Sequence, residues 1–340
     1  MPEAAGGFAE AAGHAWIGKR VLVTGAAGFV GSHLVEALVR AGARVKAFIR
    51  YSSGLRLGHL AEVERAVGAE IEIAAGDLRD QAAVERAVSG CEAVFHLGAL
   101  ISIPYSYENP GAYLETNLRG TYHVLEACRR QEVGRCVLTS SSEVYGSALY
   151  VPMDETHPLQ AQSPYAATKI GADKLGESYW RSFGMPVTIV RPFNTYGPRQ
   201  SPRAVIPQIL GQLLAGDEVR LGNVTPRRDF LFVTDSVAGY LAAGGCPLAV
   251  GEVINLGTGQ DISIEELVAL AGGILAREPK LSVDGERIRP GKSEVTRLLA
   301  GTAKARKLLG WEPRVDLGAG LRLTADWLAE QGPGGVSYRI

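Results

Sequence analysis

The chain has 340 residues, which is enough for two domains or for one large α/β unit with an added lobe, and it excludes a fold that depends on disulfides. Its 35 lysines and arginines nearly balance 36 acidic residues, so no overall field attracts nucleic acid or an anionic membrane. An anionic ligand must therefore be bound by a few placed groups. The 46% hydrophobic and 21% charged residues are typical of a soluble globular protein.

The first 18 residues are rich in alanine and glycine and predict a disordered leader. No basic start followed by an apolar block marks a secretion signal, and no later segment reaches the roughly 18 apolar residues that span a bilayer. We therefore expect a cytoplasmic protein. The four cysteines lack CxxC spacing and the six histidines lack metal-ligand spacing, so we expect reduced core thiols and no metal.

From Lys19 onward, short apolar runs alternate with segments of helical periodicity. Arg20–Gly25 predicts a strand and Phe29–Ala41 a helix. Five further predicted strands follow, separated by helix-length segments: Arg44–Arg50, Glu70–Asp77, Ala93–Ala99, Cys136–Ser141 and Val187–Pro192. This alternation predicts βαβ units and a doubly wound parallel sheet of the α/β class.

The pattern changes after Pro192, where prolines interrupt short helical pieces and Leu281–Pro290 predicts a strand and then a loop. We expect a smaller C-terminal lobe that binds the substrate over the carboxyl edge of the sheet, where open α/β folds bind ligands. The predicted division is a dinucleotide-binding domain over 19–192 with 230–260 interleaved, and a substrate-binding lobe over 193–229 and 261–335.

The segment TGAAGFVG at Thr24–Gly31 lies between the first predicted strand and helix. Its glycines permit a tight turn, backbone approach to a pyrophosphate and close helix packing, and the helix N-terminus offers unpaired N–H groups. Glycine-rich turns are common, but this strand–turn–helix context predicts a Rossmann domain that binds a dinucleotide. The predicted contacts are Gly25, Ala27, Gly28, Phe29 and Val30.

The end of the second predicted strand indicates which dinucleotide binds. It carries no carboxylate for a ribose 2′-hydroxyl, whereas Arg50, Ser52 and Ser53 can bind a 2′-phosphate. We favour NADP over NAD, with a solvated arginine as the alternative. Asp77 is predicted to accept from the adenine amino group, to cap the following helix, or to do both. Further predicted cofactor contacts are Leu78, Leu97, Ala99, Tyr165 and Lys169.

Two segments carry the chemistry, Tyr165-Ala-Ala-Thr-Lys169 and Ser140-Ser-Ser-Glu-Val-Tyr145. Tyr165 and Lys169 share a helix face, and a neighbouring ammonium lowers the pKa of a phenol. A phenolate can take a hydroxyl proton as hydride leaves the same carbon. An ordinary exposed helix pair is the alternative, but this pair follows the glycine turn by about 140 residues, with the serine cluster at the end of an intervening strand.

On these motifs the chain resembles the extended short-chain dehydrogenase/reductases of the nucleotide-sugar epimerase/dehydratase family. The resemblance covers about residues 19–330 and is carried by TGAAGFVG, GDL, HLGA, Asn117, SSSEVYG, YAATK, RPFNTYGP, RRDF and GWEP. One departure is HLGA, where the family usually has HLAA, a change between small residues. The resemblance implies an NAD(P)-dependent enzyme whose cofactor stays bound and is regenerated in each turnover.

Within this family, Glu143 resembles the glutamate of sugar 4,6-dehydratases that takes the C5 proton. Ser142-Glu143 is closer to the pair in GDP-mannose 4,6-dehydratases than to the Asp-Glu of many dTDP-glucose dehydratases. The resemblance implies that Tyr165, supported by Lys169, takes the C4 hydroxyl proton during hydride transfer, with Ser141 bound to the C4 oxygen. Glu143 then removes the C5 proton, and Ser142 or Glu143 helps the C6 hydroxyl to leave before hydride returns to C6.

Three alternatives remain. A nucleotide-sugar 4-epimerase needs Tyr165 and Lys169 but has no use for Glu143. A salt bridge at the mouth of the cleft is an alternative role for Glu143 itself. The third alternative is a dinucleotide-binding protein without catalytic activity, because the fold alone does not imply catalysis.

Two stretches, 142–175 and 191–210, resemble dehydratases of the legionaminic acid type and imply a UDP- or GDP-linked N-acetylglucosamine or a related hexose. Asn117 is expected to contact the sugar nucleotide or to buttress the catalytic helix. The other substrate contacts that the resemblance implies are Asn194, Arg203, Arg228 and Arg289, with bidentate arginines on the diphosphate or, alternatively, in solvent. Tyr113–Arg130 and Pro164–Phe183 imply a homodimer through a four-helix bundle, unless these apolar faces pack within the chain.

Overall fold

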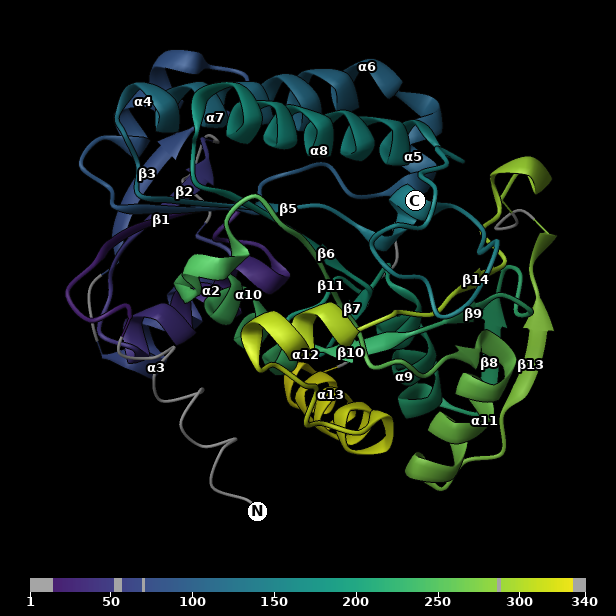
Figure 1. The fold of residues 1–340 in the computed structure, drawn as a ribbon. Helices are drawn as coiled ribbons and strands as arrows, with labels where there is room; N and C mark the ends of the chain where they lie inside the picture. The colour runs from purple at the N-terminus through teal and green to yellow at the C-terminus, as the bar shows by residue number, and fades with distance from the viewer. Residues whose placement is uncertain (1–14, 52–56, 69–70, 286–288, 333–340) are drawn as a thin grey trace.

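A parallel sheet lies at the centre of the computed structural model, which describes residues 15–51, 57–68, 71–285 and 289–332 (Figure 1). Its strand order is β11-β6-β5-β4-β1-β2-β3. The strands are β1 (Arg20–Thr24), β2 (Arg44–Arg50), β3 (Glu72–Gly76), β4 (Ala93–His96), β5 (Arg135–Thr139), β6 (Val187–Pro192) and β11 (Val253–Leu256). This is the predicted doubly wound Rossmann fold, with the order reversing between β1 and β4.

Both faces of the sheet are covered by helices, which is why its central strands are continuously apolar. Figure 1 shows α4, α7 and α8 on one face and α2 and α10 on the other. The helices around the sheet are α2 (Phe29–Arg40), α3 (Leu60–Val67), α4 (Gln81–Val88), α7 (Gly120–Arg130), α8 (Pro164–Phe183) and α10 (Val233–Gly245). Val21, Leu22 and Val23 of β1 are consequently fully buried.

Shorter elements follow the carboxyl ends of β4 and β5. They include α5 (Ile103–Glu108), α6 (Pro110–Tyr113), a π-helical turn (Leu114–Arg119) and a 3₁₀ turn (Ser142–Tyr145). After β6 come β7 (Asn194–Tyr196), α9 (Val205–Ala215), β8 (Glu218–Leu221), β9 (Arg227–Arg228), β10 (Phe230–Phe232), β12 (Ile262–Ser263), α11 (Ile264–Leu275), β13 (Lys280–Val283), β14 (Arg297–Leu298), α12 (Ala303–Leu309) and α13 (Leu317–Gln331).

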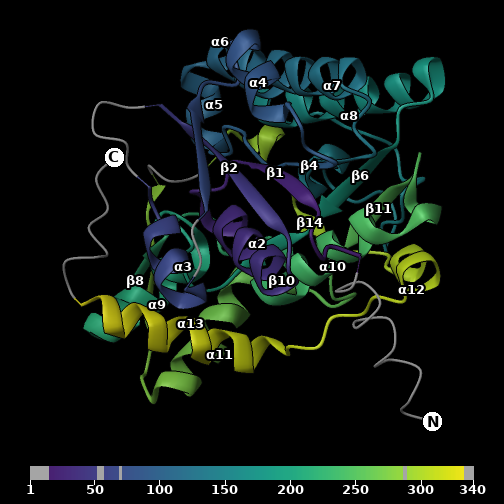
Figure 2. The ribbon, with the colours of Figure 1, turned by 90° about the vertical axis from the view of Figure 1, so that its left-hand side faces the viewer.

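These later strands form small sheets with the orders β10-β7, β12-β9-β14 and β13-β8. Figure 2 shows α9, α11 and α13 side by side, away from α4, α7 and α8. The strand β11 pairs with β6 in the large sheet although more than 60 residues separate them in the chain.

The leader predicted over residues 1–18 lies largely outside the described residues, but its last part is ordered. Residues 15–18 form a turn, and the Trp16 side chain is only 3% exposed. Its ring lies 5.3 Å from that of Phe95 in β4. The prediction was wrong for this turn because one aromatic side chain buries enough apolar surface to hold it.

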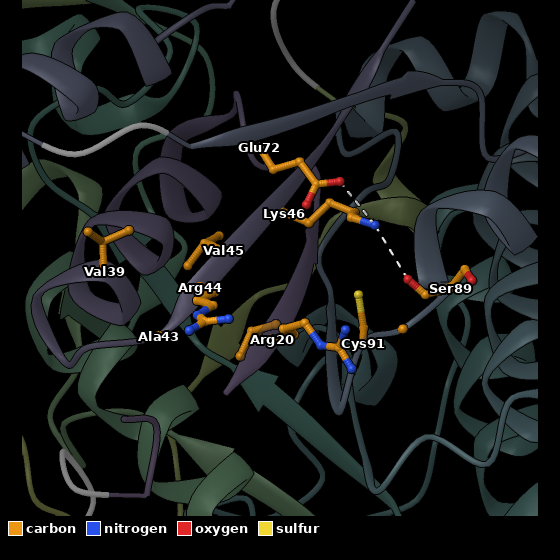
Figure 3. A pocket seen from close by; sticks show the side chains of 11 residues that line it. Arg20, Val39, Ala43, Arg44, Val45, Lys46, Glu72, Ser89 and Cys91 are labelled. Carbon is orange, nitrogen blue, oxygen red and sulfur yellow. Dashed lines mark hydrogen bonds and ion pairs between the residues drawn. The ribbon is translucent and has the colours of Figure 1, made fainter. Parts of the chain in front are cut away.

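A cavity of about 460 Å³ lies at the amino-terminal edge of the sheet (Figure 3). Arg20 and Arg44, the first residues of β1 and β2, line it, together with Lys46, which bonds the Glu72 carboxylate at 3.1 Å. None of the predicted site residues lines this cavity. Those residues follow the strands at the opposite, carboxyl edge.

Candidate active site

The start of α8 presents the tyrosine and lysine. Ser163 caps the helix by accepting a hydrogen bond from the Ala166 amide, and Pro164 occupies the first turn. Tyr165 and Lys169 follow one turn apart and are each 6% exposed. The Lys169 Nζ donates to the Thr139 carbonyl oxygen at 2.8 Å, which ties α8 to the end of β5.

The serine cluster forms the turn that follows β5. The Ser140 amide donates to the Val190 carbonyl at 2.7 Å, and the Ser141 Oγ accepts from the Glu143 amide at 3.2 Å. These bonds lead the chain into the 3₁₀ turn, where Ser142 and Glu143 are buried. The predicted groups Ser141, Glu143 and Tyr165 thus come together, because both Ser141 and Glu143 act electrostatically on the Tyr165 phenol.

Glu143 is buried without a partner. The residue is only 9% exposed, and no described residue forms a hydrogen bond or an ion pair with its carboxylate. Neither carboxylate oxygen is a fully buried atom without a hydrogen-bond partner, so both keep some contact with solvent. The salt bridge considered as an alternative for Glu143 is therefore absent from the described residues, and the carboxylate is available to a ligand.

Burial dominates the acid–base properties of the pair. It raises the pKa of Tyr165 above its ordinary value, the hydrogen bond from Ser141 lowers it, and the Glu143 charge raises it again. Burial lowers the pKa of Lys169 to about 8, while the nearby Asp173 charge acts in the opposite direction. The predicted lowering of the Tyr165 pKa is therefore wrong for the chain alone, because desolvation of the phenolate outweighs the Ser141 hydrogen bond and the neighbouring negative charges add to the rise.

Asn117 braces the helix α8, which carries Tyr165 and Lys169. It lies in the π-helical turn, a feature frequent at functional sites, and is 2% exposed. Its Oδ1 accepts from the Leu100 amide at 2.8 Å, and its Nδ2 donates to the Leu100 carbonyl at 2.9 Å and to Thr168 Oγ1 at 3.2 Å. These contacts match the buttressing role, the second of the two roles expected for Asn117.

Two of the predicted arginines converge on one carboxylate. Arg228 is 6% exposed, and its Nη2 lies 3.7 Å from Glu294 Oε1. Arg289 Nη1 lies 3.9 Å from the same oxygen and has no hydrogen-bond partner although it is buried. The Glu143 charge also acts on Arg228, whose pKa is lowered mainly by burial. The arginine pair therefore lies next to the catalytic turn and can bind an anion.

Asn194 is bonded through its backbone to the strand segment that follows Arg228, whereas Arg203 is placed differently. Asn194 opens β7, pairs with Phe230 of β10 and donates its amide to the Asp229 carbonyl at 3.1 Å. Its Oδ1 is buried without a hydrogen-bond partner. Arg203 is exposed on the loop before α9. The structure thus places Asn194 next to Asp229, the residue after Arg228, and leaves Arg203 at the surface.

The glycine turn fits a dinucleotide. Gly25 has a left-handed φ of +68°, and a Cβ atom there would lie 2.8 Å from the Gly98 amide nitrogen. A side chain at Gly31 would overlap the Gly25 carbonyl. The loops after β1 and β4 therefore touch through backbone alone, and the exposed Gly28 stands at the N-terminus of α2. This cradle leaves room for a pyrophosphate.

The remaining cofactor predictions have mixed outcomes. Asp77 does not cap α4, because Asp80 accepts the capping bond from Ala83 instead. The Asp77 carboxylate binds Arg79, which lowers the pKa of Asp77. Arg50 is exposed, and Ser52 and Ser53 lie outside the described residues. The other predicted contacts are half-buried or buried after β1, β3 and β4: Ala27, Phe29, Val30, Leu78, Leu97 and Ala99.

Several residues were not predicted to lie around the site. His96 bridges Thr24 Oγ1 at 2.8 Å and Thr121 Oγ1 at 3.0 Å, and burial lowers its pKa to about 3. The position of Glu294 could not be predicted, because no local sequence pattern indicates that it contacts Arg228 and Arg289. A buried network of Tyr145, Asp173, Arg191 and Asn255 was also missed. Tyr145 and Arg191 occur inside motifs quoted above, and Asp173 follows Lys169 by one helical turn.

Comparisons with known proteins show the family of the chain. The family model described as GDP-mannose 4,6 dehydratase matches residues 22–324. A UDP-glucose 4-epimerase of Mycolicibacterium smegmatis is 34% identical over 317 residues, 91% of this chain and 98% of that protein. A dTDP-glucose 4,6-dehydratase of an Actinoplanes species is 33% identical over 319 residues, 91% of this chain and 97% of that protein.

Solved structures are similar at the same level. The dTDP-glucose 4,6-dehydratase DesIV from Streptomyces venezuelae, solved as a double mutant with NAD bound, has a TM-score of 0.81 and 30% identity, covering 92% of this chain and 97% of its own. TunA, an NAD-dependent NDP-hexosamine 5,6-dehydratase, has a TM-score of 0.81 and 30% identity, covering 93% and 99%. Among the described residues, no helix is both long and apolar enough to cross a membrane.

Proposed function

Because the chain belongs to the extended short-chain dehydrogenase/reductase family of nucleotide-sugar dehydratases and epimerases, we propose that it is a nucleotide-sugar 4,6-dehydratase. The observation that carries the proposal is the Glu143 carboxylate, which belongs to a largely buried residue beside Tyr165 and has no hydrogen-bond or ion-pair partner among the described residues. A dehydratase needs a base for the C5 proton in addition to the tyrosine. A 4-epimerase has no step that uses such a carboxylate.

Tyr165, Lys169 and Ser141 carry out the oxidation at C4. Ser141 donates a hydrogen bond to the C4 oxygen and orients it toward Tyr165, which accepts the hydroxyl proton. Lys169, fixed by the Thr139 carbonyl, contributes positive charge that favours the phenolate. When bound, the nicotinamide supplies the hydride acceptor and donor, and its oxidised form adds a further positive charge.

Glu143 and Ser142 carry out the elimination. The C4 ketone acidifies the C5 hydrogen, and Glu143 removes it as a proton. The C5–C6 double bond forms as the C6–O bond breaks, and the hydroxyl leaves as water with a proton from Ser142 or from Glu143. Hydride then returns to C6 and a proton to C5, so no external reductant is consumed.

We propose a UDP- or GDP-linked N-acetylglucosamine or related hexose as the substrate, bound in a lobe formed by 193–229 and 261–335. Arg228 and Arg289 supply the diphosphate contact, which a chain of near-zero net charge must make locally. Asn194 adds an unpartnered buried oxygen. The similarity to TunA, which acts on a hexosamine nucleotide, supports the sugar class.

We propose that NADP is preferred to NAD. The exposed Arg50 ends β2 and forms no hydrogen bond or ion pair with a described residue, so its guanidinium is available to a 2′-phosphate. The structure of the similar enzyme DesIV contains NAD, so a preference for NADP would distinguish this protein from that relative. Calorimetric titration of both dinucleotides tests it, and Arg50→Ala is expected to weaken only NADP binding.

We propose a homodimer formed through the outer faces of α7 and α8. Tyr122 on α7 is 39% exposed, Phe183 at the end of α8 is 57% exposed, and Leu114 in the π-helical turn before α7 is 52% exposed. Apolar side chains gathered on neighbouring helices favour self-association. Sedimentation velocity is expected to give twice the 36.1 kDa chain mass, and Phe183→Lys is expected to shift the protein to monomer.

Mass spectrometry of products formed in normal and deuterated water tests the reaction. The substrates are UDP- and GDP-linked glucose, mannose and N-acetylglucosamine, with dTDP-glucose added because of the relatives. Loss of one water with one deuterium kept at C5 is the expected result. An unchanged mass with a new sugar isomer supports the 4-epimerase instead, the second candidate favoured by the 34% identical relative.

A further inference from the structure

We propose that Tyr145 is a positioning residue for the removal of the C5 proton, acting through a buried network that holds the turn with Glu143 against α8. This inference rests on the proposed 4,6-dehydratase function. Tyr145 is the last residue of the 3₁₀ turn that carries Ser142 and Glu143. It is fully buried, so it cannot itself touch a substrate without rearrangement.

The Tyr145 hydroxyl is held from two sides. It donates to Asn255 Oδ1 at 2.7 Å and accepts from Arg191 Nη1 at 2.9 Å. The Arg191 guanidinium also lies over the Tyr145 ring, 4.9 Å from its centre. One phenol therefore connects the turn to β11 through Asn255 and to β6 through Arg191.

Arg191 continues the network to the catalytic helix. Its Nε and Nη2 lie 3.0 Å and 2.9 Å from Asp173 Oδ2, and both side chains are 2% exposed. Asp173 is four residues after Lys169 and eight after Tyr165, so all three share one face of α8. The distance between the turn and the helix is thereby fixed by a chain of buried polar contacts.

Glu143 depends on this network because its own side chain has no partner. With no hydrogen bond to the carboxylate, its position is set by the backbone of the turn. The turn is held at its start by the bond between Ser141 Oγ and the Glu143 amide. At its end, the Tyr145 hydroxyl supplies the connection to the network. Gln160 also holds this end, because its amide donates to the Val144 carbonyl at 2.9 Å and its Nε2 to the Tyr145 carbonyl at 3.1 Å. Loss of the hydroxyl therefore loosens the turn near the base without detaching it.

The groups for C4 oxidation are held by other contacts. Lys169 is bonded to the Thr139 carbonyl, and Tyr165 belongs to a helix of 20 residues capped by Ser163. Neither contact includes the Tyr145 hydroxyl. Its removal is therefore expected to slow the C5 step while sparing the hydride step, a separation that general destabilisation does not produce.

Tyr145→Phe tests the proposal, with Tyr179→Phe as the matched control. Tyr179 is also buried, and its hydroxyl donates to Glu126 Oε2 at 3.0 Å, so both variants lose one buried hydrogen bond. Single turnovers of the holoenzyme are followed with the donor that the wild type dehydrates, by the absorbance of reduced nicotinamide and by deuterium incorporation at C5. Thermal melting compares the stability of the two variants.

In Tyr145→Phe, reduced nicotinamide is expected to form at a rate near that of the wild type. Deuterium incorporation and water loss are expected to fall about tenfold or more, since small misplacements of a catalytic group have effects of this size. Tyr179→Phe is expected to change neither rate. Equal slowing of both steps in Tyr145→Phe, or no slowing beyond the control, overturns the inference while leaving the proposed function intact.

A wild type that exchanges no C5 hydrogen with any donor overturns the proposed function and this inference together. Should Tyr145→Phe fail to fold, Asn255→Ala removes the acceptor of the same hydroxyl and leaves the phenol ring in place. It is expected to show the same selective loss of the C5 step. Unchanged deuterium incorporation in Asn255→Ala contradicts the proposal.

Discussion

Lys169 and Asp173 lie one turn apart on the buried face of α8, and the Asp173 charge raises the pKa of Lys169 against the lowering caused by burial. The lysine therefore titrates at about 8, far below an ordinary lysine. Its charge is partly maintained by a carboxylate that is itself paired with Arg191. This relationship links the ionisation of the catalytic helix to a residue outside the reacting groups.

Asp173→Asn is expected to move the basic limb of the pH–rate profile to lower pH. Removing the negative charge removes an effect that raises the Lys169 pKa, so the ammonium is lost at a pH below about 8. Because the protonated lysine supports the phenolate, activity is lost as the pH rises through this value. Profiles of kcat/KM for the wild type and variant measure the shift, and a basic limb that stays in place contradicts it.

Tyr165→Phe is expected to abolish C4 oxidation, with a fall of about 10²–10⁴ in kcat, the usual contribution of a general base. Loss of the hydroxyl leaves the buried ring in its contact with Tyr113, whose centre lies 6.3 Å away, so folding is expected to persist. The absorbance of reduced nicotinamide in single turnovers provides the measurement. Retained dinucleotide binding serves as the control.

Glu143→Gln is expected to separate the two halves of the reaction. Oxidation at C4 continues, whereas water loss and C5 exchange fall by about 10²–10⁴ because glutamine cannot accept the proton. Mass spectrometry in deuterated water follows both processes. Full dehydration by this variant rules out Glu143 as the base and returns it to a structural role.

Arg228→Gln is expected to weaken binding of the nucleoside diphosphate by about 1.5–3 kcal/mol, the range for hydrogen bonds to charged groups. Arg228 is almost fully buried next to Glu294, so no solvent-exposed lysine can replace it. Calorimetric titration with UDP and GDP measures the loss. Arg203→Gln is the comparison variant, since Arg203 lies at the surface, and an equal loss there counts against the assignment of Arg228.

Gly25→Ala is expected to impair dinucleotide binding and to destabilise the fold by about 1–3 kcal/mol, since a non-glycine residue is strained at its φ of +68°. The added methyl also approaches the Gly98 amide nitrogen within 2.8 Å. Gly216→Ala is the matched control, because nothing lies within 4 Å of a Cβ there and its φ of 173° suits any residue. Equal melting temperatures and equal affinities for the two variants contradict this account.

Local patterns predicted most of the sheet. The bounds of β2 and β6 are those expected from sequence, because each is a short and mainly apolar run that lies close to a glycine or a proline. The strand–turn–helix at Gly25 and the spacing of Tyr165 and Lys169 are equally local. The pairing of side chains that are far apart in the chain is not a local feature of the sequence. Tyr145 bonds Asn255 across 110 positions of the chain, and no periodicity encodes such a pair.

The errors arose where local groups compete for the same role. Asp77 and Asp80 both precede α4, and only the geometry of the turn decides that Asp80 caps the helix while Arg79 binds Asp77. The pKa of Tyr165 depends on how deeply the phenol is buried, which spacing does not reveal. Trp16 is similar, because its partner Phe95 is supplied by a distant strand.

The position of the Glu143 carboxylate also implies a conflict between the stability of the folded protein and the proposed activity. A carboxylate that gives up most of its water without gaining a hydrogen bond from a described residue lowers the free energy of unfolding. Neutral glutamine at this position is therefore expected to raise the melting temperature of the protein. A screen that selects only for a higher melting temperature would therefore enrich replacements of Glu143. Under the proposed function, such variants fold stably but no longer dehydrate the substrate.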